Sequence, residues 1–496
     1  MQAAENGCNV KLVSSLPSER AQSVMAEGGI NAALNTKDEN DSPEEHFTDT
    51  IKAACGLADP NAVWGMTQAA PELVHWLLKL GVKFNMSGYD DVDLRNFGGQ
   101  KKKRTAFAQS DTGKQIMTAM IDAVRRKEAS GMVERFSHHS FLTLRLCGNI
   151  CCGCVIRDEY SQETVELPGD AVIVATGGMH GLFGNTTGSL SNTGEVTAEL
   201  FRLGVPLANG EMIQYHPTTV KCGGKRMLIS EAARGEGGRL FAMKDGKQWY
   251  FMEEKYPELG NLMPRDITAR EIWKVSHESE VFLDMTEISE EIISNKLSGL
   301  ADDCMTYLHK DIRKEPVSVL PGIHYFMGGI LVDEQHRTPI QNLCAAGECC
   351  AQYHGANRLG GNSLLGALYG GRVAAKSACE QADVVDLSCA TQIDFPPASQ
   401  ISEIKQLNKV MQETMGVVRN ENTLLNGIQT VQALTGNLPL LGMAVLKSAL
   451  ARKESRGAHW REDYPKSNDD DYLKTTVARF DGKQIQISFV PVPERR

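Results

Sequence analysis

Arg358 stands among glycines and small apolar residues in residues 353–371, YHGANRLGGNSLLGALYGG. An arginine between glycines usually lies on a solvated loop, but these neighbours are too apolar and too small for a solvated face. A helix is predicted to start at Asn362-Ser363-Leu364, and a helix N-terminus stabilises negative charge. The segment therefore predicts a site for a group that carries negative charge.

Four shorter segments also combine cations with small residues: residues 214–219 (QYHPTT), 230–238 (SEAARGEGG), 263–266 (MPRD) and 322–330 (GIHYFMGGI). A single histidine such as His216 or His324 is more often a satisfied core residue than a ligand-binding one. The chain has a formal net charge of −10, so binding of a small dianion requires its Arg and His residues to converge in one cleft. The segments together predict such a cleft.

Residues 20–34, RAQSVMAEGGINAAL, form a further motif. Small residues and paired glycines let a backbone approach a flat ligand closely. Asn31 is expected to open a helix whose first N–H groups are free. An ordinary turn is the alternative interpretation of this segment.

Composition limits the class of protein. A chain of 496 residues has room for two or three domains, and its acidic charge argues against nucleic acid as a partner. It has no apolar run of about 18 residues and no signal-like start, so we expect a protein that is not exported by itself. Thirteen scattered cysteines favour reduced thiols in a cytoplasm. Four of them cluster in CGNICCGC (residues 147–154), where the alternating pattern favours a hairpin over a metal site.

The apolar pattern divides the chain into regions. Buried strands are predicted at residues 9–15, 171–175 and 343–346, and the last two run into glycines, as in a sheet covered on both faces that binds ligands at the carboxyl ends of its strands. The middle stretch mixes short strands, glycine turns and amphipathic helices, such as one over residues 288–308, which is typical of an inserted domain. Helical stripes follow at residues 401–411 and 424–434, and strand-like alternation closes the chain.

Many of these motifs occur in the order of one known family: AEGG, FGG then RT, ATGG, HPT, RGEGG, PRD, HYxMGG, AAGE, HGANRLGxNSL and ESRGAHxREDYP. The chain resembles the succinate dehydrogenase and fumarate reductase flavoprotein family along nearly its whole length. The resemblance implies an α/β fold: an FAD-binding doubly wound (Rossmann-like) domain, an inserted α+β capping domain and a C-terminal helical domain. The expected ranges are 1–211 and 328–384 for the FAD-binding domain, 212–327 for the capping domain and 385–496 for the helical domain and tail.

The resemblance also implies an activity, the transfer of a hydride between FAD N5 and fumarate or succinate. Arg265 would be the acid that protonates the substrate carbon, with Glu231 and Arg234 as the relay that resupplies its proton. Arginine is a poor acid in water, so this role requires a closed, dry site. The residues that match the family's substrate contacts are His216, Thr218, Ser230, His324, Arg358, Phe97 and Gly98. Those that match its FAD contacts are Ser23, Glu27, Gly28, Gly29, Ala175, Thr176, Gly177, Glu195, Glu348, Ser363 and Leu364.

Three departures from the family pattern carry predictions. Gln22 stands where covalent members have a histidine, so we expect FAD to be bound without a covalent bond, at a lower potential that favours fumarate reduction. The family's opening strand and G-x-G-x-x-G turn are missing before the first strand, which predicts weaker retention of FAD. Glu195, in NTGEV, replaces the family's Asp.

Alternatives remain open at this point. Aspartate oxidase shares the fold and most motifs, although Phe97 before Gly98-Gly99 stands where that enzyme would offer a carboxylate. A reductase of another unsaturated carboxylate and a non-catalytic flavin module are further possibilities. The sequence has no C-x-x-C-H haem motif and no ferredoxin-like cysteine run, so the resemblance implies a separate iron-sulfur subunit as electron-transfer partner. We therefore expect a cytoplasmic protein at the inner face of a membrane, held there only through partner subunits.

Overall fold

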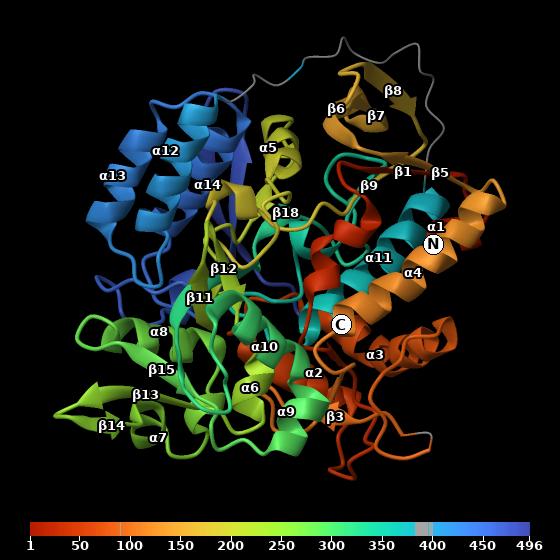
Figure 1. Cartoon of the computed structure of the whole chain (residues 1–496). Coiled ribbons are helices and arrows are strands. Elements are labelled where there is room, and N and C mark those ends of the chain that lie inside the picture. Colours follow the sequence, from red (N-terminus) through yellow and green to blue (C-terminus); the bar gives the residue numbers. More distant parts are fainter. Residues whose placement is uncertain (90, 382–394, 396–399) are drawn as a thin grey trace.

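The computed structural model describes residues 1–89, 91–381, 395 and 400–496. Three regions are visible in Figure 1: a mixed region of helices and strands that contains the red N-terminal segment and residues 362–381, a green region over about residues 213–308, and a blue helical region over residues 401–451. The predicted α/β class is confirmed. None of the described helices is long and apolar enough to cross a membrane.

Two pairs of parallel strands form the frame of the first region. β1 (Val10–Ser14) pairs with β5 (Val133–Ser137), and β9 (Val172–Val174) pairs with β19 (Leu343–Ala345). Helix α11 (Asn362–Gln381) packs on β9 and β19, and α1 (Gln2–Glu5) packs on α11. The strands predicted near residues 9–15, 171–175 and 343–346 are confirmed, because continuous apolar runs are stable where a sheet is covered.

Helices and short strands from residues 30–129 complete this region. α2 (Pro43–Ala53), α3 (Pro60–Leu80) and α4 (Thr112–Ala129) surround a small antiparallel sheet of β2 (Ile30–Asn31), β4 (Thr105–Ala106) and β3 (Leu94–Arg95). The expectation that Asn31 opens a helix is wrong. Asn31 lies in β2, and its N–H donates to the Gly361 carbonyl oxygen at 3.1 Å, so tertiary hydrogen bonding overrides the local capping signal.

The cysteine-rich segment is an antiparallel hairpin of β6 (His139–Cys147) and β7 (Ile150–Asp158), extended by β8 (Thr164–Pro168). The Sγ atoms of Cys151 and Cys152 bond to backbone carbonyls instead of converging. Among the described residues, no group of three or more His, Cys, Asp or Glu side chains is placed to hold a metal ion. The hairpin prediction is therefore confirmed.

The expectation of reduced thiols throughout is wrong for one described pair. Cys8, just before β1, forms a disulfide with Cys379 near the end of α11. The two cysteines are far apart in the chain, and only the packing of the N-terminal segment on α11 brings them together. Their pairing could not be read from spacing alone.

The inserted region has a four-stranded antiparallel sheet of its own, in the order β14 (Lys247–Trp249), β13 (Arg239–Lys244), β15 (Val281–Asp284) and β16 (Val317–Ser318). It shares an apolar core with α6 (Glu231–Gly235), α7 (Phe251–Lys255) and α8 (Arg265–Val275). The helix predicted over residues 288–308 is divided into α9 (Glu290–Lys296), α10 (Ser298–Asp303) and the π-turn η5 (Cys304–Leu308). The chain leaves the helical conformation at Leu297, whose side chain is buried.

The two strands by which the chain enters and leaves the inserted region are neighbours in one sheet. β11 (Ile213–Cys222) pairs antiparallel with β17 (Leu320–Phe326) and with β12 (Lys225–Leu228). The β11–β17 register opposes His216 to Gly322 and Ile213 to Phe326. This pairing brings the two predicted histidines, His216 and His324, to one place.

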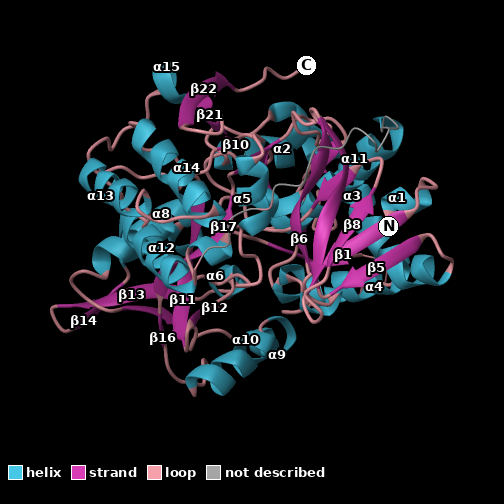
Figure 2. Cartoon of the chain, turned by 90° about the horizontal axis from the view of Figure 1, so that it is seen from above, coloured by secondary structure: helices cyan, strands magenta, loops and turns pink. Residues whose placement is uncertain are grey.

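The C-terminal region confirms the predicted helical stripes. α12 (Ile401–Thr414), α13 (Glu421–Val431) and the almost wholly buried α14 (Asn437–Ala451) share one core. In Figure 2 these helices lie together on one side of the molecule, near α5 (Glu195–Arg202). The closing hairpin, β21 (Lys474–Phe480) and β22 (Ile485–Pro491), joins β10 (Leu207–Ala208), β18 (Gly329–Leu331) and β20 (Cys350–Ala351) in a five-stranded sheet. The predicted boundary at residues 384/385 lies outside the described residues.

Candidate active site

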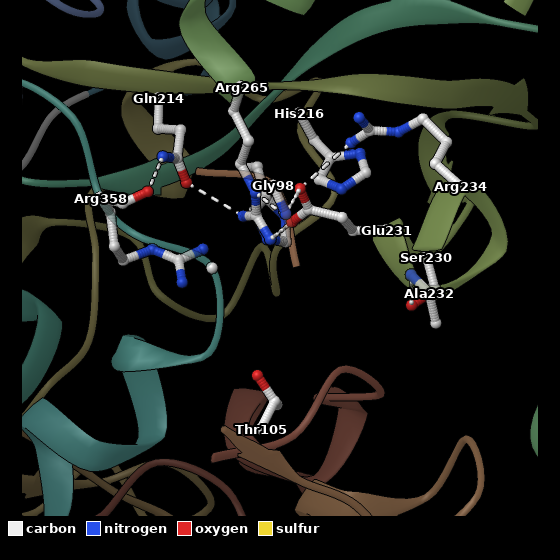
Figure 3. Close-up of polar contacts among 12 residues, drawn as sticks. Gly98, Thr105, Gln214, His216, Ser230, Glu231, Ala232, Arg234, Arg265 and Arg358 are labelled. Carbon is white, nitrogen blue, oxygen red and sulfur yellow. Dashed lines mark hydrogen bonds and ion pairs between the residues drawn. The ribbon is translucent and has the colours of Figure 1, made fainter. Parts of the chain in front are cut away.

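Arg265 occupies the first position of α8 and points back toward β11 and α6 (Figure 3). Its Nε and Nη2 donate to Glu231 Oε2 at 2.8 and 2.6 Å, and its Nη1 donates to Gln214 Oε1 at 3.1 Å. Only 6% of its surface is exposed. Three hydrogen bonds therefore fix the direction of this guanidinium while keeping it away from bulk water.

Glu231 connects Arg265 to a second arginine. It is the first residue of α6, whose N-cap, Ser230, accepts a hydrogen bond from Ala232 N. Glu231 Oε1 accepts from Gly98 N at 3.1 Å and lies 3.4 Å from Arg234 Nη2. Burial alone would raise the Glu231 pKa, but the charges of Arg265 and Arg234 outweigh it and hold that pKa below its usual value.

Arg234 is also buried, and it is only partly satisfied. Its Nη1 donates to the Asn261 carbonyl oxygen at 2.6 Å, whereas its Nε and Nη2 have no hydrogen-bond acceptor. Burial is the main cause that lowers the Arg234 pKa. The charge of Glu231 acts to raise this pKa, and the charge of Arg265 acts to lower it. Arg265, Glu231 and Arg234 thus form a continuous chain of charged groups that leads from β11 into the inserted region.

Arg358 faces this chain from the other side (Figure 3). Its guanidinium carbon lies 4.3 Å from the centre of the Tyr325 ring, and its Nε is buried without an acceptor. Gln214 joins the two sides, because its Nε2 donates to the Arg358 carbonyl oxygen at 2.9 Å while its Oε1 accepts from Arg265. Burial, followed by the charge of Arg265, lowers the Arg358 pKa to about 9.

His216 and His324 lie between these arginines. Their ring centres are 5.1 Å apart, and His324 Nδ1 is 2.7 Å from Thr187 Oγ1. Burial, reinforced by the positive charge of Arg265, holds the pKa of both histidines well below the usual value. Both imidazoles are therefore neutral near pH 7 and can donate or accept hydrogen bonds without adding charge.

The remaining residues predicted to contact substrate lie around this cluster. Thr218 Oγ1 donates to the Ile229 carbonyl oxygen at 2.9 Å, and Ser230 caps α6. Phe97 is buried between two glycine segments. A Cβ atom added to Gly28 would lie 3.0 Å from the Phe97 ring, and one added to Gly360 would lie 3.1 Å from Phe97 Cβ, so both backbones touch this side chain. The structure therefore brings together all the residues predicted for catalysis and substrate binding.

Some of the residues predicted to contact FAD follow the carboxyl ends of the parallel strands β9 and β19. Ala175 and Thr176 follow β9 and are exposed, and Glu348 follows β19. A Cβ atom on Gly178 would lie 2.7 Å from Glu348 Oε1, so the two turns touch. An accessible backbone at this edge of a parallel sheet is where a dinucleotide binds.

Three other segments contribute to this group. Ser363 and Leu364 lie in the first turn of α11, while Ser23 lies in η2 (Gln22–Met25). Gly28 and Gly29 enter β2, and Glu27 before them has a buried Oε2 without a partner; burial raises its pKa to about 8. A neutral carboxyl, a helix N-terminus and small residues fit a flat ring that becomes anionic on reduction.

Glu195 fits this arrangement less well than the other predicted contacts. It opens α5 as an exposed residue, and the nearest charges that act on it are those of Arg157 and Glu159. Its backbone follows Gly194, whose φ of 87° reverses the chain before the helix. No contact of Glu195 with the arginine cluster is present among the described residues.

Gln214 is the site residue that was not singled out from the sequence. It is fully buried and donates to Asn357 Oδ1 at 2.9 Å as well as to the Arg358 carbonyl oxygen. The signal for it is its position two residues before His216 in one strand, because residues i and i+2 of a strand point to the same face. A strand assignment for QYHPTT would have placed Gln214 beside the histidine.

Comparisons with known proteins define the class of this chain. Residues 1–364 match the family model described as an FAD binding domain, and residues 434–495 match the one described as fumarate reductase flavoprotein C-term. The match to the FAD binding domain therefore includes the exposed turns after β9 and β19, the small residues before β2 and the start of α11.

Relatives narrow this class to one family. The chain is 37% identical to a succinate dehydrogenase flavoprotein subunit of Bacillus subtilis, over all of this chain and 95% of the relative. It is 31% identical to the 8-methylmenaquinol:fumarate reductase flavoprotein subunit of Wolinella succinogenes, over 98% and 88%. A solved point mutant of the E. coli quinol fumarate reductase subunit FrdA superposes with a TM-score of 0.89 at 27% identity, over 99% and 94%.

The chain belongs to the succinate dehydrogenase and fumarate reductase flavoprotein subunit family. It is accordingly a flavoprotein oxidoreductase, as the order of its sequence motifs predicted. The arginines, the histidines and the carboxylate of the cluster all come from the motifs that the chain shares with this family. These motifs are scattered along the sequence, and the fold brings them together.

Proposed function

We propose that this protein interconverts fumarate and succinate, with Arg265 as the proton donor to the substrate carbon. One observation carries the proposal: Arg265 and Arg234 share one carboxylate, Glu231, and a third buried arginine, Arg358, faces this group over the Tyr325 ring. Excess buried positive charge is costly unless an anion offsets it. A small dicarboxylate has the charge and the spacing of acceptors to do so.

Each end of the dianion has its own donors in this proposal. Arg358, with its free Nε, and His324 would hold one carboxylate, while His216 would hold the other, next to Thr218 and the segment Phe97-Gly98. Charge-assisted hydrogen bonds at both ends would orient the substrate and exclude water from its reacting carbons. Bound FAD would supply the hydride chemistry, held by the turns after β9 and β19 and by the start of α11.

The proton would reach Arg265 through the charged chain. Arg265 Nη2 is 2.6 Å from Glu231 Oε2, and Glu231 Oε1 is 3.4 Å from Arg234 Nη2. Arginine yields a proton only where a carboxylate beside it can return one and where water is excluded. The 6% exposure of Arg265 and the burial of Glu231 are consistent with both requirements.

The matched test uses two arginines of the same helix. Arg265→Gln should lower fumarate reduction, measured with a reduced viologen, at least about a hundredfold, in line with loss of a general acid. Arg270→Gln is the control, because Arg270 stacks over Trp460 at 4.1 Å outside the cluster and should retain turnover within about threefold. A loss of less than threefold in Arg265→Gln would require another proton donor. Hydrogen peroxide formed from added aspartate would favour the oxidase alternative.

We further propose that FAD is bound without a covalent bond and that fumarate reduction is the favoured direction. Gln22 cannot form a histidyl link, and its Oε1 instead accepts a hydrogen bond from Ser189 N at 2.5 Å. Acid precipitation should therefore release all yellow colour into the supernatant. Flavin retained in the pellet would contradict non-covalent binding, and succinate oxidation faster than fumarate reduction in dye assays would contradict the direction.

The proposed electron-transfer partner is a separate iron-sulfur subunit, through which the protein would sit at the cytoplasmic face of a membrane. The support is that its relatives are named as flavoprotein subunits and that one similar solved structure is a quinol-fumarate reductase with menaquinol molecules. Purification from the native host with a tag on this chain should recover a second subunit with an iron-sulfur spectrum. Recovery of this chain alone from gently solubilised membranes and cytosol would contradict it.

A further inference from the structure

A buried network of uncharged polar groups surrounds the first residue of α11, Asn362. The Oδ1 atom of Asn362 accepts from Asn31 Nδ2 at 2.8 Å and lies 3.0 Å from His46 Nε2. Its Nδ2 donates to Thr50 Oγ1 at 3.0 Å. Asn31, His46 and Asn362 are fully buried, so these bonds replace water for all three side chains.

The network assigns the proton on His46. The Thr50 hydroxyl donates to the His46 carbonyl oxygen at 2.8 Å, so its oxygen is left to accept from Asn362 Nδ2. This orientation turns the Asn362 carbonyl oxygen, which can only accept, toward His46. His46 must therefore carry its proton on Nε2, while its buried Nδ1 has no partner.

His46 stays neutral in this environment. Burial, followed by the positive charge of Arg104, lowers its pKa to about 3. Arg104 is itself fully buried and paired with Asp41 at 2.8 Å and Asp49 at 3.0 Å, so its charge is fixed next to the ring. The imidazole thus acts as a permanent hydrogen-bond donor, and a buried donor with one fixed acceptor holds that acceptor in place.

Asn31 transmits this position to the glycine turn before α11. Its Nδ2 also donates to the Gly360 carbonyl oxygen at 2.7 Å, and its Oδ1 accepts from Gln100 Nε2 and Thr105 Oγ1. A Cβ atom on Gly361, whose φ is 83°, would lie 2.1 Å from Asn31 Oδ1. The turn therefore packs directly against the network.

The other side of the turn touches the charged chain. A Cβ atom on Gly360 would lie 2.9 Å from Glu231 Oε2, the oxygen that binds Arg265. Arg358 lies two residues before Gly360 in the same segment. A displacement of this turn would accordingly move both the carboxylate that binds Arg265 and the arginine that faces it.

We propose that His46 is a positioning residue for the reaction: its Nε2–H fixes Asn362, and through the Gly360-Gly361 turn it sets the relative positions of Glu231 and Arg358. His46 bonds to none of the arginines of the cluster among its described contacts. This inference depends on the proposed function for its catalytic consequence, although the proton assignment does not.

The catalytic test compares two substitutions of one residue in the FAD-loaded protein. Glutamine keeps an N–H donor at the end of its side chain, whereas leucine removes it. We expect His46→Leu to lose at least about thirtyfold in kcat/KM for fumarate, because small displacements of reacting groups are costly, and His46→Gln to stay within about threefold. Equal losses in the two variants would overturn the proposal.

His336→Leu controls for the general cost of removing a buried histidine. His336 bonds to the Ala345 carbonyl oxygen and to the Tyr353 hydroxyl, outside the turn, and burial lowers its pKa to about 4. We expect it to lower Tm about as much as His46→Leu does while kcat/KM changes less than about threefold. If activity per folded molecule fell equally in both leucine variants, His46 would have a structural role only.

A second measurement is independent of activity. In the protein labelled with ¹⁵N-histidine, the His46 signals should show a neutral ring protonated at Nε2 from pH 5 to pH 9, and they should vanish in His46→Gln. A ring protonated at Nδ1, or one that titrates in this range, would overturn the proposal. If these spectra are as expected but the wild-type protein does not reduce fumarate, it is the proposed function that fails and not the network.

Discussion

Two clusters of buried arginines and carboxylates in this chain are satisfied to very different degrees. In the C-terminal cluster, Arg452 donates five hydrogen bonds of 2.7 to 2.8 Å: to Glu211, Glu454, Thr476 and the carbonyl oxygens of Tyr472 and Lys474. In the site cluster, Arg358 and Arg234 keep buried N–H groups without acceptors. The same residue type thus has all its donors satisfied at Arg452 and only part of them at Arg358 and Arg234.

The difference separates charges that maintain the fold from charges that await a ligand. Glu454 pairs with both Arg452 and Arg456, at 2.8 Å each, so the C-terminal cluster is close to neutral without any added group. The site cluster has more cations than carboxylates. Unpaired buried donors in a native structure mark places where a function, and not stability, selects the residue.

The largest expected effect is on stability, in the C-terminal cluster. Arg452→Met should lower the free energy of unfolding by about 4 kcal/mol, because it leaves Glu211 buried without its arginine and removes one of the two arginines that pair with Glu454. Urea denaturation followed by circular dichroism measures it. Arg313→Met, which breaks an exposed pair with Glu290, is the control and should leave the urea midpoint almost unchanged. Similar shifts in the two variants would show that the C-terminal cluster is not specially sensitive.

Glu27 tests a third situation, a buried carboxyl with an oxygen that has no partner. Its pKa is raised from 4.5 to about 8, chiefly by burial, so the unfolded chain ionises before the folded one does. Ionisation of Glu27 should therefore lower the free energy of unfolding as pH rises from about 4.5 to about 8. The loss should be about 3 kcal/mol at pH 7, and it should level off above pH 8. Glu27→Gln should be more stable than the wild type at pH 7 and equal to it at pH 4. Parallel pH profiles from urea denaturation would contradict the neutral carboxyl.

Glu231→Gln tests the proposed relay through turnover. The variant keeps the shape of the side chain but cannot return a proton to Arg265, so we expect fumarate reduction to fall about a hundredfold. It also leaves Arg265 and Arg234 without their shared anion. Added succinate should therefore raise its Tm more than it raises that of the wild type. Full turnover in this variant would exclude Glu231 from the relay.

Arg358→Met makes the sharpest contrast with Arg452→Met, since the substitution is identical. We expect the KM for fumarate to rise about thirtyfold through loss of a charge-assisted contact. The free energy of unfolding without ligand should stay within about 1 kcal/mol of the wild type, because the removed charge was not paired there. Steady-state kinetics and urea denaturation test the two parts. Strong destabilisation would mean that Arg358 maintains the fold as Arg452 does.

Much of the site could be predicted from single segments. The apolar runs before ATGG and AAGE predicted β9 and β19, and the N-terminus of α11 was predicted from NSL after paired glycines. Local signals failed where a long-range partner decided the outcome. Asn31 has the character of a helix cap but lies in a strand that pairs with Thr105 and Ala106. Cys8 and Cys379 could not be paired from their spacing.

The sequence by itself determined the family, the order of the motifs and the chemical types of the residues in the cluster, because each motif is a local pattern of charge, size and backbone freedom. Only the tertiary structure decided which cations are paired. Arg452 and Arg358 both have small residues next to them in the sequence, yet one meets two carboxylates and the other an aromatic ring. The Arg452–Glu211 pair joins residues 241 positions apart, and no local pattern specifies a contact at that separation.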